Sequence, residues 1–309
     1  MIEMLRVVEI EINSFCNRRC PWCPNSKIDR RKNNPMPFMT YMKVIRELKK
    51  HNFQGTISYS RNNEPFADFR QLRAYTLAAA IMLPKARLVT NTNGDFLTKT
   101  RILLSGIDEL SIMDYDCKGM EKCKQQLLDW KATITDVINN VIYADLNGVK
   151  IAYCTDWPKN TVLEDKGGFL KKEGALKNME FRADLALRDY PCVDPAYFLA
   201  IDYDGSVMPC CQMRHDNPEH KDFILGNVAK DKIEDILQSK KYIEILGNTS
   251  LCTGKDLPLP CQHCQKGVGR YTRDNPSIYF SERYRKGVGP EDVNRSLYTC
   301  PHEEQQITE

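Results

Sequence analysis

Short stretches of alternating apolar and polar residues run through the first half of the chain, separated by longer stretches with helical spacing. The segment 5–13 alternates and is rich in β-branched residues, which predicts a strand. Five more strands are predicted, at 55–60, 86–90, 109–113, 141–144 and 149–154. The segments 41–50 and 71–82 have the apolar period of helices. This alternation predicts an α/β fold, a parallel sheet or partial barrel, with its site at the carboxyl ends of the strands.

The pattern changes near residue 188. Beyond it cysteines become frequent, a hairpin is indicated around Asp204 and Gly205, and 233–246 has the spacing of a helix. The last segment is polar and without strong periodicity, which is typical of a tail packed over the site or of a partly disordered end. We therefore expect a first domain at 1–187, a second at 188–270 and a tail at 271–309.

Composition and charge narrow the class of protein. The 309 residues include 44 Lys and Arg against 41 Asp and Glu, and the formal charge of +3 is too small to indicate a nucleic-acid surface. The N-terminus lacks the pattern of a signal peptide and no apolar run reaches the ~18 residues of a membrane span, so we expect a cytoplasmic protein without a membrane partner. Because the cytosol keeps thiols reduced, the clustered members of the 13 cysteines are expected to be metal ligands.

Cys16, Cys20 and Cys23 form a CxxxCxxC loop directly after the first predicted strand. Pro21 and Pro24 argue against a regular helix there, and three thiolates in such a loop can bind three irons of a cubane while the fourth iron stays open. Zinc with a fourth ligand from elsewhere is the alternative, but common zinc sites use CxxC pairs. The spacing favours an iron–sulfur cluster with one open coordination position.

A second group of cysteines lies in the C-terminal part. Cys192 is followed eighteen positions later by Cys210, and Cys261 and Cys264 form a CxxC pair. Four thiolates make a closed ligand set, which suits either a structural zinc ion or a saturated [4Fe–4S] cluster. Composition alone favours zinc, and the residues leave both interpretations open.

With Trp22 just before its last cysteine, the first loop resembles that of the radical S-adenosylmethionine (radical SAM) superfamily. The resemblance implies a [4Fe–4S] cluster whose open iron binds the amino and carboxylate groups of S-adenosylmethionine. Electron transfer, from a flavodoxin- or ferredoxin-type reductant, then yields a 5′-deoxyadenosyl radical that abstracts a hydrogen atom from the substrate. The cofactor supplies the difficult chemistry, and the protein supplies orientation and exclusion of water.

Further segments match cofactor-binding positions of that superfamily. The segment 61–65 follows the second strand, and the resemblance implies that Glu64, with Asn63 beside it, meets the ammonium group of the cofactor. Asn93, in a Thr-Asn-Gly segment after the third strand, and Asp114, after the fourth, are the other implied cofactor contacts. A plain Asn-Gly turn and a solvated loop acid are the alternatives for these two residues.

The C-terminal part resembles the SPASM/twitch extensions of radical SAM enzymes. A cysteine, a Gly-x4-Cys hairpin ending at Cys210, a Leu-Gly-Asn-Val turn at 225–228 and a CxxC pair carry this resemblance. It implies one auxiliary [4Fe–4S] cluster held by the four cysteines, since a second cluster would need several more cysteines after Cys264. The expected fold is a partial (β/α)6 TIM-like barrel followed by a twitch/SPASM domain built from a β-hairpin and a helix.

Within the superfamily, the segments 9–18, 23–26 and 93–97 resemble the twitch dehydrogenases of aminoglycoside pathways, among them that of butirosin biosynthesis. In those enzymes an Arg-Gly-Gly segment lies near the substrate. Here Lys166, Gly167 and Gly168 take its place, which makes Lys166 a candidate substrate contact through a point charge. The implied reaction is oxidation of a small polar metabolite, such as a sugar or an aminocyclitol, to a ketone, with the electron passing to the auxiliary cluster.

Three other functions stay open. Hydrogen return from the thiol of Cys252 or Cys300 would give epimerisation instead. Many SPASM proteins modify peptides, although no peptide-recognition domain is expected ahead of the first strand. The non-enzymatic alternative is a zinc-stapled nucleic-acid-binding module that uses the basic stretch 27–32, but that stretch is more simply a solvated loop and the three-cysteine loop stays unexplained.

Overall fold

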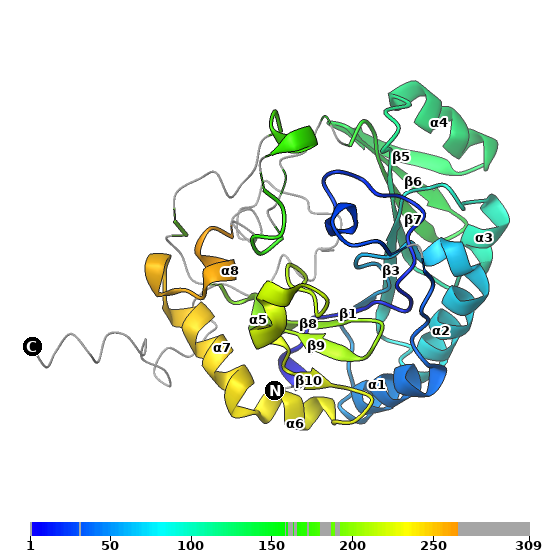
Figure 1. Cartoon of the computed structure of the whole chain (residues 1–309). Helices are drawn as coiled ribbons and strands as arrows, with labels where there is room; N and C mark the ends of the chain where they lie inside the picture. Colours follow the sequence, from blue (N-terminus) through cyan, green and yellow to red (C-terminus); the bar gives the residue numbers. More distant parts are fainter. Residues whose placement is uncertain are drawn as a thin grey trace, which may run out of the picture.

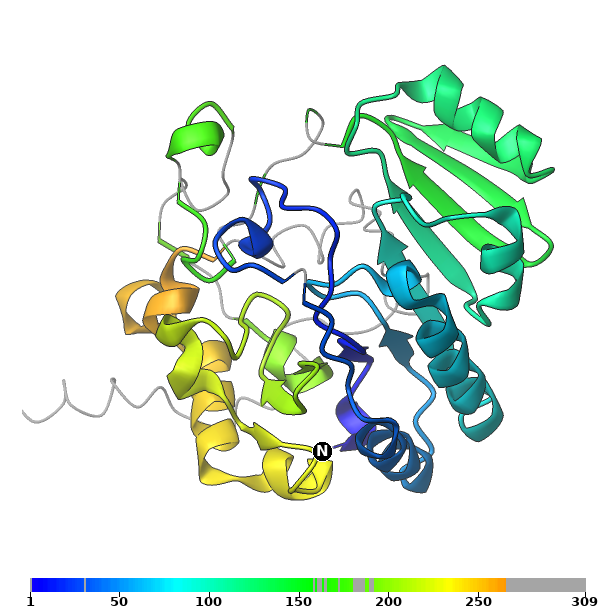
Figure 2. The ribbon, with the colours of Figure 1, turned by 45° about the vertical axis from the view of Figure 1, so that its right-hand side comes forward.

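The computed structural model describes residues 2–30, 32–157, 159, 163, 166–171, 173–179, 187–188 and 192–264. Their strands form one mixed sheet of ten strands in the order β10-β9-β8-β1-β2-β3-β4-β7-β6-β5. The sheet curves into an open half-barrel with helices along its outer side (Figure 1). The loop after β1, in dark blue, crosses the upper end of this half-barrel (Figure 2).

Six neighbouring strands run parallel and form the centre of the sheet. They are β8 (Phe198–Ile201), β1 (Val7–Ile10), β2 (Thr56–Ser58), β3 (Arg87–Thr92), β4 (Glu109–Met113) and β7 (Val149–Cys154). The carboxyl ends of parallel strands meet at one edge of a sheet, so the loops that follow these strands lie together there.

The two faces of the central strands differ in polarity because successive side chains alternate between them. One face packs against the helices and joins the main hydrophobic core, through Val8, Ile57, Leu88, Leu110 and Ile151. On the other face Glu9 lies opposite Ser58, and Asn91 lies opposite Ser111. The inner face of the half-barrel is therefore lined by acidic and small polar groups.

Three helices cover the outer face, α1 (Phe38–Lys50), α2 (Phe69–Met82) and α3 (Lys99–Leu104) (Figure 1). The side chain of Asp68 caps α2 by accepting from the Gln71 amide, and the hydroxyl of Thr98 caps α3 by accepting from the Arg101 amide. The helices predicted at 41–50 and 71–82 are thus confirmed, each beginning a few residues earlier than expected.

One part of the sheet departs from the parallel order that the alternation predicts. β5 (Thr133–Ile138) and β6 (Val141–Leu146) run antiparallel to each other, and β6 runs antiparallel to β7. Asn147 and Gly148 have φ values of +52° and +93°, which is the two-residue turn that returns a strand directly along its neighbour. The strand expected at 141–144 exists, but a tight turn and not a helix leads out of it; α4 (Met120–Asp129) precedes β5.

The C-terminal part continues the same sheet. β8 pairs with β1, and β9 (Ser206–Met208) and β10 (Gly226–Asn227) extend the sheet in antiparallel order. The hairpin expected around Asp204 and Gly205 joins β8 to β9, and Gly205 takes a φ of +88° that few other residues adopt. The short helix α5 (Asp194–Tyr197) leads directly into β8.

The helix expected at 233–246 is two helices, α6 (Ile233–Gln238) and α7 (Lys240–Leu251). Ser239 separates them because its backbone is extended and its hydroxyl accepts from the Tyr242 amide, capping α7. α6 docks on α1, where the Glu47 carboxylate accepts from the Ile233 amide at 2.7 Å. The last described helix is α8 (Leu259–Gln262).

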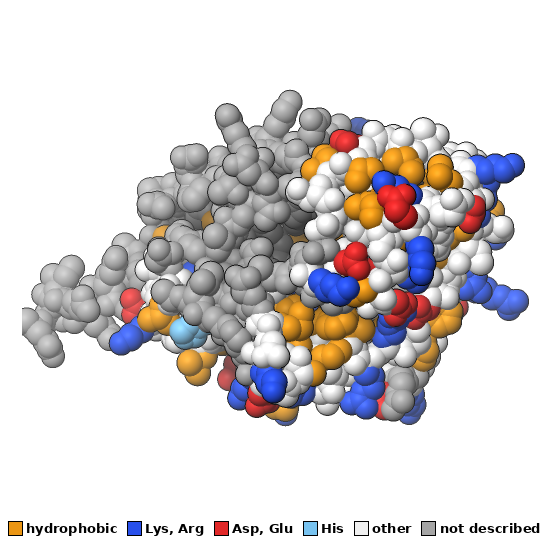
Figure 3. Space-filling model, turned by 90° about the horizontal axis from the view of Figure 1, so that it is seen from above, with side chains coloured by type: hydrophobic (Ala, Val, Ile, Leu, Met, Phe, Trp, Pro, Cys, Tyr) orange, Lys and Arg blue, Asp and Glu red, His pale blue; other side chains and the backbone are white. Residues whose placement is uncertain are grey.

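The described surface carries charges of both signs. On the face seen from above, Lys and Arg side chains are interspersed with Asp and Glu side chains over the part that the structure describes (Figure 3). Among the same residues, no helix combines the length and the apolar character that crossing a bilayer requires.

Gly55→Ala tests the close approach of the chain before β2. A Cβ atom there would overlap the Arg6 carbonyl oxygen and lie 2.7 Å from the Phe53 ring. The Arg6 carbonyl accepts from the Thr56 amide at 2.8 Å and is held in place. We expect a free energy of unfolding lower by about 1–3 kcal/mol, measured by urea denaturation.

Gly247→Ala is the matched control, because a Cβ atom at Gly247 in α7 meets nothing within 4 Å. Alanine in a helix is favoured over glycine by up to ~1 kcal/mol, so this variant should unfold at an equal or higher urea concentration. Equal losses in both variants would contradict the packing argument.

Candidate cluster and substrate sites

The three cysteines of the first loop follow β1 at the carboxyl edge of the sheet. The Cys16 amide donates to the Arg30 carbonyl at 3.2 Å, and the Cys23 amide donates to the Cys20 carbonyl at 3.0 Å, so the loop folds back on itself. A single 3-10 turn, Pro24–Ser26, follows. As the prolines indicate, no regular helix spans the three cysteines.

These three thiols influence one another. Burial, together with the charges of neighbouring cysteines, raises the pKa of Cys16 to about 12 and that of Cys20 to about 11. Burial also raises the pKa of Cys23, while the positive charges of Arg214 and Lys166 lower it. Three thiolates so close together need bound cations, which fits the iron of a cluster.

Arg18 fixes this loop from its position between Cys16 and Cys20. Its guanidinium group pairs with the Asp95 carboxylate in the loop after β3, with Nε 2.6 Å from Oδ2. It also pairs with both oxygens of Asp116, after β4, at 2.7 and 2.8 Å. Bidentate pairs of this kind are directional, so one side chain sets the positions of three loops.

Glu64, in the loop after β2, is almost completely buried. Its carboxylate accepts from the Thr92 hydroxyl at 2.7 Å, from the Asn93 amide at 2.8 Å and from the Phe66 amide at 3.1 Å. Burial raises the pKa of Glu64 to about 7, against the effect of these hydrogen bonds. The side chain thus joins the loop after β2 to the loop after β3.

Asn63, Asn93 and Asp114 lie at the same edge and also make contacts within the protein. The Asn63 side chain accepts from the Arg61 amide at 3.0 Å, and Asn93 donates to the Asn17 side chain at 2.9 Å. The Asp114 carboxylate accepts from three amides, those of Lys118, Gly119 and Asp156. All four expected cofactor residues are therefore gathered at one edge, and their contact with a cofactor stays a prediction.

Trp22 belongs to an aromatic group that the sequence does not reveal. Its ring centre lies 5.7 Å from those of Tyr115 and Trp157, which are 5.2 Å apart. Leu170 packs in the same apolar group. The rings come from three loops far apart in the sequence, so no spacing pattern identifies them.

The four cysteines of the second group line one pocket. Cys192 precedes α5, Cys210 follows β9, and Cys261 and Cys264 lie in and just after α8. Burial, together with the charges of the other cysteines, raises the pKa of Cys210 well above its ordinary value. The structure thus brings together a set that spans more than seventy residues of sequence, and its binding of a cluster stays a prediction.

Arg188 lines the same pocket and supports the CxxC segment. Its guanidinium group donates to the Cys264 carbonyl at 2.7 Å, and its amide donates to the Gln262 carbonyl at 2.7 Å. Within the described residues, no three His, Cys, Asp or Glu side chains converge closely enough to share one metal ion. A cubane takes one thiolate per iron, so cysteines arranged around a cavity suit it, whereas zinc holds sulfur at ~2.3 Å from one centre.

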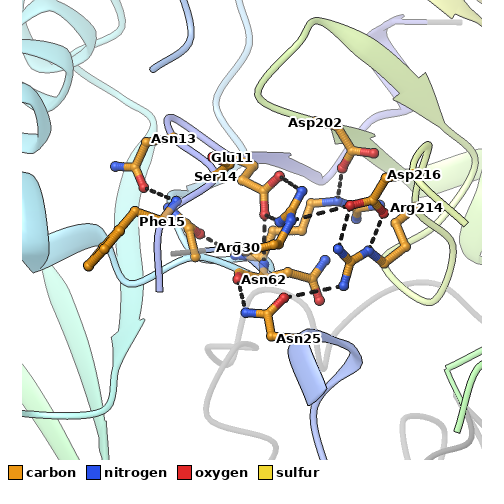
Figure 4. Close-up of polar contacts among 12 residues, drawn as sticks. Glu11, Asn13, Ser14, Phe15, Asn25, Arg30, Asn62, Asp202, Arg214 and Asp216 are labelled. Carbon is orange, nitrogen blue, oxygen red and sulfur yellow. Dashed lines mark hydrogen bonds and ion pairs between the residues drawn. The ribbon is translucent and has the colours of Figure 1, made fainter. Parts of the chain in front are cut away.

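A buried network of charged groups joins residues from separate parts of the chain (Figure 4). Arg30 pairs with Glu11 at 2.5 and 3.0 Å, and its Nε lies 3.3 Å from Asp216. Arg214 pairs with Asp216 at 2.5 and 2.6 Å and donates to the Asn25 side chain at 3.3 Å. The network joins β1, the first cysteine loop and the C-terminal part.

Arg61 continues the network. It pairs with Glu9 at 3.0 Å and with Asp202, and His215 donates from Nδ1 to Asp202 at 2.7 Å. Burial disfavours the charge of His215, but Asp202 outweighs this effect and raises the His215 pKa. The network then contains four carboxylates, three guanidinium groups and one imidazolium, namely Glu9, Glu11, Asp202, Asp216, Arg30, Arg61, Arg214 and His215.

The basic stretch 27–32 is only partly the solvated loop that its sequence indicates. Lys27 and Lys32 are exposed, but Arg30 is 4% exposed. The reason is Glu11, whose carboxylate is fully buried just after β1 and requires a nearby positive charge.

The remaining candidates differ in their positions. Lys166 lies close enough to Cys23 for its charge to lower the pKa of that thiol. Cys252 is buried at the end of α7, and its role as a hydrogen donor stays a prediction. Cys300 lies outside the described residues.

Known proteins share these features. Residues 192–265 match the SPASM family, an iron-sulfur cluster-binding domain. The S-adenosyl-L-methionine-dependent 2-deoxy-scyllo-inosamine dehydrogenase of Niallia circulans is 27% identical over 244 residues, which cover 78% of this chain and 86% of that protein. The crystal structure of BtrN in complex with AdoMet and 2-DOIA matches with a TM-score of 0.62 at 22% identity, covering 85% of this chain and 94% of that one. The crystal structure of BtrN in an open conformation matches with a TM-score of 0.52 at 21% identity, covering 79% of this chain and 85% of that one.

The chain has the fold of these two structures, and its residues 192–265 match a SPASM domain. The resemblance predicted from the sequence is thereby confirmed, together with the fold class. The relatives depend on S-adenosyl-L-methionine or hold AdoMet, and the matched domain family binds an iron-sulfur cluster, which agrees with the expected cofactors. The SPASM match lies within the expected second domain at 188–270, whose boundaries stay a prediction.

The sequence does not single out the charged residues that hold this fold together. Arg18, Arg30 and Arg61 each pair with carboxylates on other segments of the chain, whereas Arg214 pairs with the nearby Asp216 and donates to the Asn25 side chain. A signal existed for Arg18, because acids follow two adjacent strands at one edge of the sheet. No comparable signal existed for Arg214, whose neighbours come from separate parts of the fold.

His215→Gln should make stability less dependent on pH. The folded-state pKa of His215 is raised above the unfolded value of about 6.5, so its ion pair contributes fully below that pH. The contribution falls as pH rises from about 6.5 through the folded pKa. The urea midpoint of the native protein should therefore exceed that of the variant most at pH 6 and least at pH 9. A difference that grows with pH would contradict the assignment.

Proposed function

We propose that this chain is a radical SAM oxidoreductase that oxidises an alcohol of a small polyhydroxylated substrate of the aminocyclitol class. The observation that carries the proposal is the second cysteine group. Four thiols from three separate segments line one pocket, and four thiolates are a closed ligand set that leaves no position for substrate. A saturated cluster can exchange electrons but cannot bind substrate at iron, which suits an electron acceptor.

The first loop complements that site. Its three thiols give an incomplete ligand set, and Arg18, Asp95 and Asp116 hold the loop against the ends of β3 and β4. When bound there, a [4Fe–4S] cluster and S-adenosylmethionine supply a radical able to remove a hydrogen atom from carbon. The aromatic rings around Trp22 offer an apolar wall beside Cys23 that excludes water.

The inner face of the half-barrel supports a polar substrate. Ser58, Asn91 and Ser111 project from neighbouring strands onto this face. The Asn91 side-chain oxygen is buried and has no hydrogen-bond partner among the described residues, so it is available to a substrate hydroxyl or ammonium group. Lys166, near the first cysteine loop, adds a positive charge that can bind a hydroxyl oxygen.

The relatives agree with this assignment. One curated relative is a 2-deoxy-scyllo-inosamine dehydrogenase, and one of the matching structures holds AdoMet and 2-DOIA. We propose that this chain also oxidises an aminocyclitol. Passage of the electron to the C-terminal pocket is likewise proposed, on the strength of its cysteine set.

Two cysteine variants separate the two sites. Anaerobic reconstitution of the native protein should give about eight irons per chain. The triple variant with Cys16→Ala, Cys20→Ala and Cys23→Ala should hold about four irons per chain. This triple variant should form no 5′-deoxyadenosine from S-adenosylmethionine and dithionite. Cys210→Ala with Cys261→Ala should also hold about four irons yet still form 5′-deoxyadenosine. Cys117→Ala, outside both groups, is the control and should keep both properties.

The assay reports on each part of the proposal. Formation of 5′-deoxyadenosine by the triple variant would refute the radical assignment. Stoichiometric zinc in place of iron in the C-terminal pocket would refute the electron acceptor.

The reaction type is tested with 2-deoxy-scyllo-inosamine in deuterated water. Dehydrogenation predicts a ketone and one 5′-deoxyadenosine per turnover, with no solvent deuterium introduced at the reacting carbon by the enzyme. The products are analysed by mass spectrometry after derivatisation without any deuterium-donating reagent, so that all deuterium found in the product comes from the solvent. An unoxidised product carrying deuterium at carbon would show epimerisation and overturn the proposed reaction.

A further inference from the structure

The segment 166–169 has an irregular backbone that needs anchoring from outside. Lys166, Gly167 and Gly168 have φ values of +56°, +65° and +83°, so three successive residues are left-handed. Such a run forms neither helix nor strand, and a lysine in this region is held there only by surrounding structure. Contacts on either side of Lys166 therefore decide where its ammonium group lies.

His220 supplies one such contact and joins the segment to the C-terminal domain. Its ring Nε2 lies 3.0 Å from the Gly167 carbonyl oxygen, and its Nδ1 lies 3.1 Å from the Arg214 amide nitrogen. A backbone amide can only donate, so Nδ1 is the acceptor and Nε2 carries the proton. The imidazole then donates to Gly167, and burial lowers the pKa of His220, which keeps the ring in this neutral form.

Gly167 fits this contact because it has no side chain. A Cβ atom there would lie 3.0 Å from Nε2 of His220. Any larger residue would displace the imidazole or the segment, since His220 itself is fully buried. The glycine thus serves both the backbone conformation and the approach of the ring.

Arg214 supports the next part of the segment. Its guanidinium group lies over the Phe169 ring, 5.6 Å from the centre, while it pairs with Asp216 and contacts Asn25. Asn25 is two residues beyond Cys23, and Arg214 is four residues beyond Cys210. The segment 166–169 is therefore tied to the loops of both cysteine groups.

We propose that His220 is a positioning residue that holds the Lys166 segment beside the first cysteine loop, so that Lys166 meets a polar substrate at the radical site. This proposal rests on the proposed function for the identity of that substrate. His220 does not touch the substrate; it acts through the Gly167 carbonyl. The Arg214 amide on the other side of the ring fixes the tautomer that makes the contact.

Two isosteric variants isolate the contact. His220→Asn places an amide near the position of Nδ1, so it can accept from Arg214 but does not reach Gly167. His220→Gln places its amide nitrogen near the position of Nε2, so it can still donate to Gly167. Both remove the imidazole from the same buried site, which makes the glutamine variant the matched control.

Hydrogen–deuterium exchange of the anaerobically reconstituted protein reads the anchoring directly. Peptides covering 166–171 should exchange about fivefold or more faster in His220→Asn than in the native protein, as expected for loss of one hydrogen bond. In His220→Gln they should exchange at nearly the native rate. Equal exchange in the two variants, or no change in His220→Asn, would overturn the proposal.

Steady-state kinetics with 2-deoxy-scyllo-inosamine test the link to Lys166. His220→Asn should raise KM and the ratio of 5′-deoxyadenosine to ketone, and Lys166→Met should do the same. If His220 acts through Lys166, the double variant should be little worse than Lys166→Met alone. If the effects of His220→Asn and Lys166→Met multiply in the double variant, the two residues act independently and the proposal is overturned.

Failure of the proposed function has a different signature. A native protein that holds no iron or forms no 5′-deoxyadenosine would refute the radical assignment. The exchange comparison does not depend on turnover, so it would still decide whether His220 anchors the segment.

Discussion

The buried ion pairs around Glu11 and Asp202 are the constraint on which the rest of the structure depends. A carboxylate removed from water is tolerated only when a positive charge and hydrogen bonds replace the lost hydration. Glu11 just after β1 therefore needs Arg30 from the cysteine loop, and Asp202 after β8 needs Arg61 and His215. Since each partner comes from a different segment, satisfying the charges fixes the first loop, the half-barrel and the C-terminal domain relative to one another. Such pairs add little net stability compared with apolar packing, and their contribution here is to geometry.

The continuous sheet carries that geometry to both cysteine groups. β8 belongs to the SPASM domain but pairs with β1, the strand that leads into the first cysteine loop. The first cysteine group thus follows β1, and Cys210 of the second group follows β9, two strands away in the same sheet. Both groups gather thiols in surroundings that raise thiol pKa values, so neither holds thiolates without bound cations. Arg214 contacts the loop of the first group through Asn25 and lies just beyond Cys210 of the second in the sequence.

The half-barrel differs from a closed barrel in what fills its interior. A closed eight-stranded barrel is packed with branched apolar side chains, whereas the inner face here carries serine, asparagine and glutamate. Apolar burial is instead concentrated between the sheet and the outer helices, as in the layer formed by Ile57 and Leu88. This division leaves an interior suited to polar ligands while the outer layer supplies the stability. The left-handed segment at Lys166 lies beside the first loop and is held by contacts from the opposite domain.

The sequence by itself determined the central strands of the first half, the helices at 41–50 and 71–82, the two cysteine groups and the resemblance to radical SAM enzymes with a SPASM domain. Periodicity and ligand spacing are local properties, so they can be recognised along the chain. It did not determine the antiparallel strands β5 and β6, the break at Ser239 or the burial of Arg30, because these depend on a turn, a cap and a counter-charge that other parts of the fold complete. Only the tertiary structure placed Cys192, Cys210, Cys261 and Cys264 around one pocket and set His220 against Gly167. Contacts between residues distant in sequence leave no periodic trace, and folding alone brings them together.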